Sequence, residues 1–285
     1  MDDPGQIGFA LRIQGEYPSM NANERQICDF ILGNAADIIH MTITEVAERC
    51  RTSEASMVRL SKKLGYKGFQ ALKINIAQNI VEPESQIHAA LTRRSDTPSI
   101  ASKVFSASVQ ALEDTLKVLD LGQVEAAVEA IGRARRLLFF GVGGSGPVAA
   151  DAQHKFLKIG CLAQALADAN LQAMSASVLG ERDVVVAISH SGSSNSIVEA
   201  ARLARDAGAT TICITNYGRS PLQKCCDIHL ATSSVETALN SDALASRIAE
   251  LAIIDLLFVA VSFRNYDRAS ANLRKTRRSL DGAKL

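Results

Sequence analysis

Two segments of this 285-residue chain decide its fold: LLFFGVGGSG, residues 137–146, and DVVVAISHSGSSN, residues 183–195. Each is an apolar run that opens into a loop of glycines and serines. A continuous apolar run bounded by glycine predicts a strand buried on both faces, as in a parallel sheet. A glycine- and serine-rich loop between a strand and the next helix directs backbone N–H groups and hydroxyls at one point. Such an arrangement favours an anion, above all a phosphate, at the N-terminus of the helix.

Outward from these segments, strand and helix patterns alternate from residue 136 onward. We expect strands at 136–142, 162–166, 184–189, 210–215 and 228–231, with helices near 146–159, 170–179, 194–207 and 220–225. This alternation predicts an α/β domain with a mostly parallel five-stranded sheet. In a flavodoxin-like strand order, the loops after the first and third strands both border the switch point, so the two serine loops would converge on one crevice.

Three further helices are expected around this sheet. Residues 99–119 and 123–135 are amphipathic and lead into the first strand. Residues 243–263 form a long helix with apolar side chains on several sides, which indicates burial or contact with another subunit.

The overall composition limits the classes of protein to which this chain can belong. The apolar content of 47% supports a full core, and a net charge of +1 leaves the choice of partner to local charge. The six cysteines have no zinc-site spacing and indicate free thiols in a reducing cytoplasm. No signal peptide is expected, and residues 251–263, interrupted by Asp255, are too short to span a membrane. No metal or cofactor is expected.

The first 80 residues have an all-helical pattern. Asn21 is suited to cap a helix, and Thr42 with Glu45 forms a capping box at the start of a short helix. After a turn at 51–52, a second helix begins near Ser53 and ends at Gly65. A short helix, a tight turn and a helix are the outline of a helix-turn-helix. We therefore expect a DNA-binding domain at 1–80, a linker at 81–98 and an α/β domain at 99–285.

The charge of the second helix supports contact with DNA. Between residues 49 and 73 there are seven basic residues and a single acid, Glu54, and such clustering is typical of a nucleic-acid contact. The alternative is a helical bundle whose charged face is only solvated. The candidate DNA-binding residues are Ser53, Ser56, Arg59, Lys62, Lys63 and Lys67.

This organisation resembles the RpiR-type bacterial transcriptional regulators, which join a helix-turn-helix to a SIS (sugar isomerase) domain. The resemblance covers nearly the whole chain and rests on residues 45–73, on FFGVGGSGPVAADAQHKFLKIG and ISHSGSSNSIVEAARLARDAGATTICITN, and on ALASRIAELAIIDLLF. It implies that a phosphosugar effector binds through its phosphate. The residues it implies for that phosphate are Gly143, Gly144, Ser145, Ser189, His190, Ser191 and Ser194. Arg59 matches an arginine of the family's recognition helix; Lys62 stands where some members have arginine and lacks the bidentate fork that reads guanine.

The resemblance implies a cytoplasmic regulator, in the family's habit a repressor, that binds a palindromic operator as a dimer or tetramer. The rival function is a SIS-type aldose–ketose isomerase, which needs an acid and a base near the sugar carbons. His154 and Glu236 are candidates for that role or for contact with the sugar of an effector. The helix-turn-helix favours the regulator, and no catalytic residue is assigned. His190 either donates to phosphate when protonated or only spaces the loop. The basic residues of 264–278 are either a solvated tail or a second DNA contact.

Overall fold

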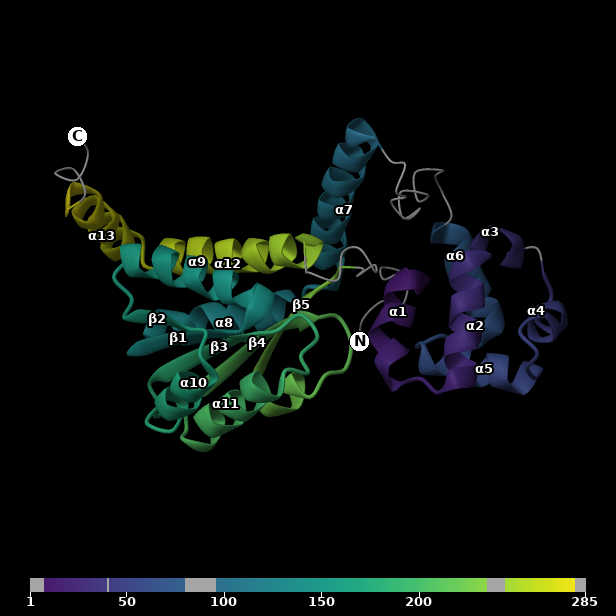
Figure 1. The fold of residues 1–285 in the computed structure, drawn as a ribbon, viewed down its shortest axis with the longest axis horizontal. Coiled ribbons are helices and arrows are strands. Elements are labelled where there is room, and N and C mark those ends of the chain that lie inside the picture. The colour runs from purple at the N-terminus through teal and green to yellow at the C-terminus, as the bar shows by residue number, and fades with distance from the viewer. Residues whose placement is uncertain (1–7, 40, 80–95, 235–243, 280–285) are drawn as a thin grey trace. The chain divides into compact units, whose positions relative to one another are not determined.

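A computed structural model describes residues 8–39, 41–79, 96–234 and 244–279 (Figure 1). The chain divides into two compact units, with the boundary along the chain at residues 89 and 90. The first unit is helical and the second contains the sheet. Within the described ranges, none of the helices combines the length and hydrophobicity that crossing a bilayer requires.

The helical unit consists of α1 (Phe9–Glu16), a 3-10 turn at Tyr17–Ser19, α2 (Ala22–Gly33), α3 (Ala35–Ile38), α4 (Ile43–Arg49), α5 (Glu54–Lys63) and α6 (Phe69–Asn79). The predicted capping box of Thr42 and Glu45 is present, and Asn21 caps α2 as expected, in a second capping box with Glu24. One face of α5 is buried in the helical core, including Met57 and Leu60. Because the chain turns sharply between α4 and α5, with Arg51 at φ 51°, these two helices form the expected helix-turn-helix.

The second unit is a parallel sheet with helices on both faces. Its strands are β1 (Arg136–Gly141), β2 (Ala163–Leu166), β3 (Asp183–Ile188), β4 (Thr210–Asn216) and β5 (Ile228–Thr232). Their order is β2-β1-β3-β4-β5 and every pairing is parallel. This is the flavodoxin-like order predicted from the sequence, so β1 and β3 are neighbours at the switch point.

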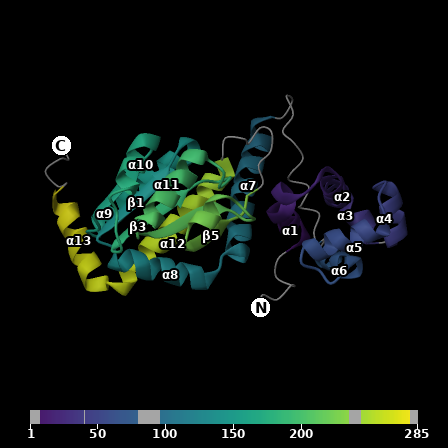
Figure 2. The same ribbon diagram turned by 90° about the horizontal axis from the view of Figure 1, so that it is seen from below.

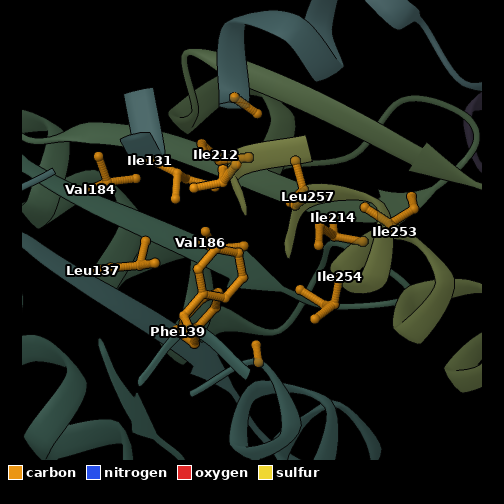
Figure 3. Packing of buried hydrophobic residues seen from close by; sticks show 14 of the residues in the cluster. Ile131, Leu137, Phe139, Val184, Val186, Ile212, Ile214, Ile253, Ile254 and Leu257 are labelled. Carbon is orange, nitrogen blue, oxygen red and sulfur yellow. The ribbon is translucent and has the colours of Figure 1, made fainter. Parts of the chain in front are cut away.

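The helices of this unit are α7 (Thr97–Val118), α8 (Leu121–Arg133), α9 (Gly146–Lys158), α10 (Ala169–Ala176), α11 (Asn195–Asp206), α12 (Leu244–Arg264) and α13 (Tyr266–Ser279). Alternate strand residues point to opposite faces. Leu137, Phe139 and Val186 therefore pack against α8, α9 and α12, as Figure 3 shows for Ile131, Ile254 and Leu257. Phe140 and Val185 pack on the other face, which α10 and α11 cover (Figure 2).

Three expectations change. Most of the segment 264–278, interpreted as a tail, lies in helix α13, because buried Ala269 packs into the core and the Asn272 side chain donates to the Ile159 carbonyl at 2.9 Å. The segment expected to be helical at 220–225 is a 3-10 turn, Leu222–Cys225. The expected linker, residues 81–98, lies outside the described residues up to 95, and its last two residues already belong to α7.

Candidate functional site

A cavity of about 180 Å³ lies at the carboxyl ends of β1 and β3. It is lined by Val142, Gly144, Ser145, Ile188, Ser189, His190, Ser191 and Ser194. Six of these eight residues are among those predicted to surround a phosphate. The parallel pairing of β1 with β3 brings the two loops together, because Gly141 pairs with Ile188 at the last position of both strands. Gly143, also predicted, is not among the lining residues.

The first wall of the cavity is the loop after β1. It makes one 3-10 turn, Gly143–Ser145, closed by the N–H of Ser145 donating to the Val142 carbonyl at 3.1 Å. The backbone then passes close over the strand end: a Cβ on Gly141 would lie 2.5 Å from the Ser145 carbonyl oxygen. Any side chain at 141 would therefore displace Ser145, which is only 8% exposed and faces the cavity.

The second wall is the loop after β3. The N–H of Ser189 donates to the Ile214 carbonyl of β4, so the loop starts from a fixed point. Gly192 then adopts φ 59°, and a Cβ there would lie 2.4 Å from the Ser220 hydroxyl. This turn brings Ser194 back toward Ser189, whose hydroxyl donates to that of Ser194 over 3.4 Å. A bond of that length is weak, so both hydroxyls remain available to a ligand.

Helices α9 and α11 begin at the cavity, and neither has a capping side chain. In the same unit, α7, α8 and α10 begin at Asp96, Asp120 and Asp168, and each carboxylate accepts hydrogen bonds from N–H groups of the first turn. The residues that precede α9 and α11 are Ser145 and Ser194, whose hydroxyls accept no such bond. An aspartate there would occupy the N–H groups and repel an anion; serine leaves them to a negatively charged ligand.

A buried carboxyl that the sequence analysis did not single out borders this cavity. Glu250 on α12 is 1% exposed, and its Oε1 accepts from the Ser145 hydroxyl at 3.5 Å. Its Oε2 is buried and has no hydrogen-bond partner. Burial raises its pKa to about 7, although the Ser145 hydroxyl and the charge of Arg247 oppose the rise. An acid within the apolar stretch LASRIAELAII was the available signal in the sequence.

The two residues expected near the sugar have different outcomes. His154 lies on α9, but its side chain is exposed and is not among those that line the cavity. The inward face of α9 is formed by residues such as Val148, Ala152 and Phe156. Position 154 lies on another face of the helix, which is exposed. Glu236 lies outside the described residues.

In the helical unit, the predicted DNA contacts differ in whether they have a partner within the chain. Arg59, Lys62 and Lys67 are exposed. Ser53 caps α5 by accepting from the N–H of Ser56, and the Ser56 hydroxyl accepts from the Arg59 guanidinium at 3.1 Å. Lys63 donates to Glu24 at 2.8 Å and to the Ser19 carbonyl, which ties α5 to α2.

The comparisons with known proteins agree in both units. The family model described as "Helix-turn-helix domain, rpiR family" matches residues 7–83, and the SIS domain model matches residues 130–260. An uncharacterised HTH-type transcriptional regulator of Caldanaerobacter subterraneus is 39% identical over 267 residues, 94% of this chain and 95% of its own.

Two further relatives carry names that bear on function. The HTH-type transcriptional regulator RpiR of Escherichia coli is 33% identical over 273 residues, 96% of this chain and 92% of its own. A solved structure of the Vibrio vulnificus NanR protein complexed with ManNAc-6P is similar with a TM-score of 0.63 and 28% identity, over 98% of this chain and 100% of that one.

Proposed function

This chain belongs to the rpiR family of helix-turn-helix transcriptional regulators, and from that premise we propose that it is a cytoplasmic repressor controlled by a sugar phosphate. The effector binds in the cavity at the ends of β1 and β3, and its binding changes the affinity of the helical unit for DNA. One observation carries the effector proposal: four serines and two uncapped helix N-termini converge on a single cavity.

The chemistry of the cavity suits the phosphate of the effector. Ser145, Ser189 and Ser194 offer hydroxyl donors, and the first turns of α9 and α11 offer backbone N–H groups and the positive ends of two helix dipoles. Within the described ranges, the residues that line the cavity include neither lysine nor arginine. A phosphate held by neutral donors is bound reversibly, as a sensor requires.

The relatives narrow the chemical class of the effector. The similar NanR structure holds ManNAc-6P, so a hexose or amino-sugar 6-phosphate is the first candidate here. A keto-deoxy-phosphogluconate, N-acetylmuramate 6-phosphate, and pentose or inositol phosphates present the same phosphate group and belong in the same test.

For the DNA-binding half, we propose that α5 enters the major groove with Arg59 and Lys62 outward. Their exposure supports this assignment, as does the small size of Ser53 and Ser56 at the start of the helix. Lys63 contributes less in this proposal, because Glu24 already neutralises its charge. Arg59 is the candidate for base contact, and Lys62 for phosphate contact.

A palindromic operator needs two copies of the chain, and we propose that α7 and α12 form their interface. The support is an apolar stripe on α7 that the chain itself leaves open, with Phe105 74% and Leu116 71% exposed. On α12, Phe263 is 71% exposed. Replacing Phe105 by glutamate should shift the sedimentation of the protein toward the monomer, while the same change at exposed Leu171 on α10 should not.

The test of the proposed function begins with a panel of sugar phosphates and thermal unfolding. A ligand at one hundred times its Kd stabilises the folded protein by about 2.7 kcal/mol. The ligand found is then added to the protein bound to an operator, selected by the protein itself from a pool of random duplexes. We expect release of DNA. A ligand that binds but leaves DNA affinity unchanged would contradict effector control.

The DNA half has its own control. Arg59→Ala and Lys62→Ala should each weaken operator binding, and Lys62→Ala should reduce the slope of log affinity against log salt by about one. Lys224→Ala removes the same charge from an exposed position of the α/β unit and should change neither quantity. Equal losses in all three variants would show that only net charge matters.

The rival function, isomerisation, has one specific observation in its favour. Glu250 is a carboxyl with a pKa of about 7 beside the cavity, which is the property a general base needs near neutral pH. Product analysis after an hour with the protein separates the two functions. A sensor returns the sugar phosphate unchanged, whereas an isomerase converts it and loses that activity in Glu250→Gln.

A further inference from the structure

Glu250 is unusual among the acids of this chain because it is buried next to a proposed anion site. Its side chain is 1% exposed, Oε1 has one long hydrogen bond from Ser145, and Oε2 has none. A buried carboxylate without compensating partners is strongly disfavoured, whereas a neutral carboxyl is tolerated. The surroundings of Glu250 thus favour the protonated form even before a ligand arrives.

A bound phosphate would strengthen that preference. Ser145 both lines the cavity and donates to Glu250, so a single hydroxyl separates the carboxyl from the place proposed for the phosphate. If Glu250 is ionised, its carboxylate accepts the hydrogen bond of the Ser145 hydroxyl and repels the negatively charged phosphate. If it is neutral, the repulsion disappears and the Ser145 hydroxyl is free to donate to the phosphate.

We propose that Glu250 takes up a proton when the phosphate of the effector binds, so that this regulator binds its effector more tightly as the pH falls. The proposal rests on the phosphate site of the proposed function and adds a second input to it. Because burial already brings the pKa of Glu250 to about 7, the uptake occurs within the range over which cytoplasmic pH varies.

In the described part of the chain, α7, α8, α9 and β5 pack on α12, and the charged side chains of these elements have to be considered beside Glu250. Arg247, one turn earlier on α12, is the charged group that lowers its pKa. α7 packs on α12 with buried Ala111 and Thr115, and its Asp114 pairs with Lys117. The remaining neighbours are paired farther along the helices or on β5: Lys155 of α9 with Asp151 and Asp255, Glu125 of α8 with Arg264, and the His229 ring with the Cys226 carbonyl.

Among the described residues that line the cavity, His190 is the one with an imidazole or carboxyl side chain. A protonated imidazole would also attract an anion and give a pH dependence of the same sign. The experiment must therefore separate the two residues.

The probe is inorganic sulfate, which stays a dianion over the whole range, whereas the phosphate of a sugar phosphate itself titrates near pH 6. The Kd of sulfate is measured on the full-length protein at constant ionic strength. For one proton and a pKa near 7, the Kd rises about tenfold between pH 6 and pH 8. Glu250→Gln should show a flat Kd close to the value of the unmodified protein at pH 6.

Two matched variants complete the series. Glu181→Gln removes an exposed carboxylate at the opposite end of the sheet and should keep the tenfold change. His190→Asn should also keep it. If His190→Asn abolishes the pH dependence while Glu250→Gln retains it, the proposal is overturned in favour of the histidine.

A measurement on the unmodified protein covers the case in which Glu250→Gln fails to fold. Calorimetry at pH 8 in two buffers of different ionisation enthalpy should show nearly one proton taken up per sulfate bound. Zero uptake, or a Kd that does not change with pH, overturns the proton linkage and leaves the phosphate site standing. Absence of sulfate and phosphate binding at every pH overturns the site itself.

Discussion

The polar side chains at the two ends of the sheet differ in how completely they are hydrogen-bonded. At the amino end, Asp183 is fully buried, and its carboxylate accepts from Arg135 at 2.9 and 3.1 Å, from Arg136 at 2.6 Å and from the N–H of Gly180 at 3.0 Å. At the carboxyl end, the Ser189 and Ser194 hydroxyls share one bond of 3.4 Å, and Glu250 has a single bond of 3.5 Å.

This difference in hydrogen bonding distinguishes the groups that stabilise the fold from the groups that are available to bind a ligand. Asp183 is satisfied by the chain itself, so its carboxylate and the two arginines stabilise the fold. The serine loops are held in place by glycine turns and backbone bonds, while their side chains and helix N-termini stay incompletely paired. A ligand with several acceptors gains most where donors are already ordered and unused.

The largest expected effect is at the amino end. Asp183→Ala removes the hydrogen bonds from Arg135, Arg136 and Gly180 at once and should lower the free energy of unfolding of the α/β unit by about 3 kcal/mol, measured by urea denaturation; the two arginines are partly exposed, so water can solvate the charges that remain. The arginines hold the pKa of Asp183 well below its usual range. Its contribution is therefore complete above the pKa of the unfolded chain and is lost as the pH falls through the folded value, so the variant should be less sensitive to acid. Unchanged ligand affinity in the folded variant would confirm that the two ends are independent.

The next effect is at the carboxyl end and concerns affinity. A hydrogen bond to a charged group contributes about 1.5 to 3 kcal/mol, so Ser145→Ala and Ser189→Ala should each raise the Kd of the best sugar phosphate at least tenfold. Titration calorimetry measures this change. Because both hydroxyls have weak bonds in the free protein, the free energy of unfolding should change by less than about 1 kcal/mol. A large loss of stability with unchanged Kd would mean that these serines stabilise the fold and do not bind the ligand.

A third effect is the pH dependence of stability that Glu250 causes without any ligand. Its folded pKa of about 7 lies above its ordinary value of 4.5, so between these values the folded protein retains a proton that the unfolded chain has released. Stability should therefore fall as the pH rises from 4.5 to 7, by at most about 1.4 kcal/mol per pH unit, and level off above 7. Urea denaturation at pH 5, 6, 7 and 8 checks this, and Glu250→Gln should remove the slope. The same slope in both proteins would assign it to another group.

The smallest effect is a control within the same loop. The Ser193 hydroxyl donates to the Ser191 carbonyl, and Ser193 is exposed and not among the cavity-lining residues. Ser193→Ala should change the Kd of the sugar phosphate less than twofold. A loss equal to that in Ser189→Ala would mean that the loop as a whole, and not the hydroxyls facing the cavity, determines affinity.

Much of the fold follows from local patterns. Each strand was predicted from an apolar run and each serine loop from its glycines, and the parallel order then placed the two loops at one edge. The caps at Asn21 and Thr42 were predicted for the same reason: partners three residues apart in a helix start meet regardless of the rest of the chain. Residues 264–278 were missed as a helix because their charge hides the burial of Ala269.

The surroundings of individual site residues depend on contacts between distant parts of the chain. Lys63 reaches Glu24, 39 residues earlier, and this ion pair cannot be read from α5 alone. His154 follows Ser145 closely in sequence, yet the phase of α9 turns its side chain outward. Glu250 is 105 residues from Ser145.

The sequence by itself determined the two-part organisation, the order of the strands and the hydroxyls at their ends, because periodicity and turn chemistry act over a few residues. Only the tertiary structure decided which charged groups share an environment. The burial that raises the pKa of Glu250 and the arginines that satisfy Asp183 arise from the packing of elements far apart in the chain, and desolvation and Coulomb interaction depend on distance in space, not on distance in sequence.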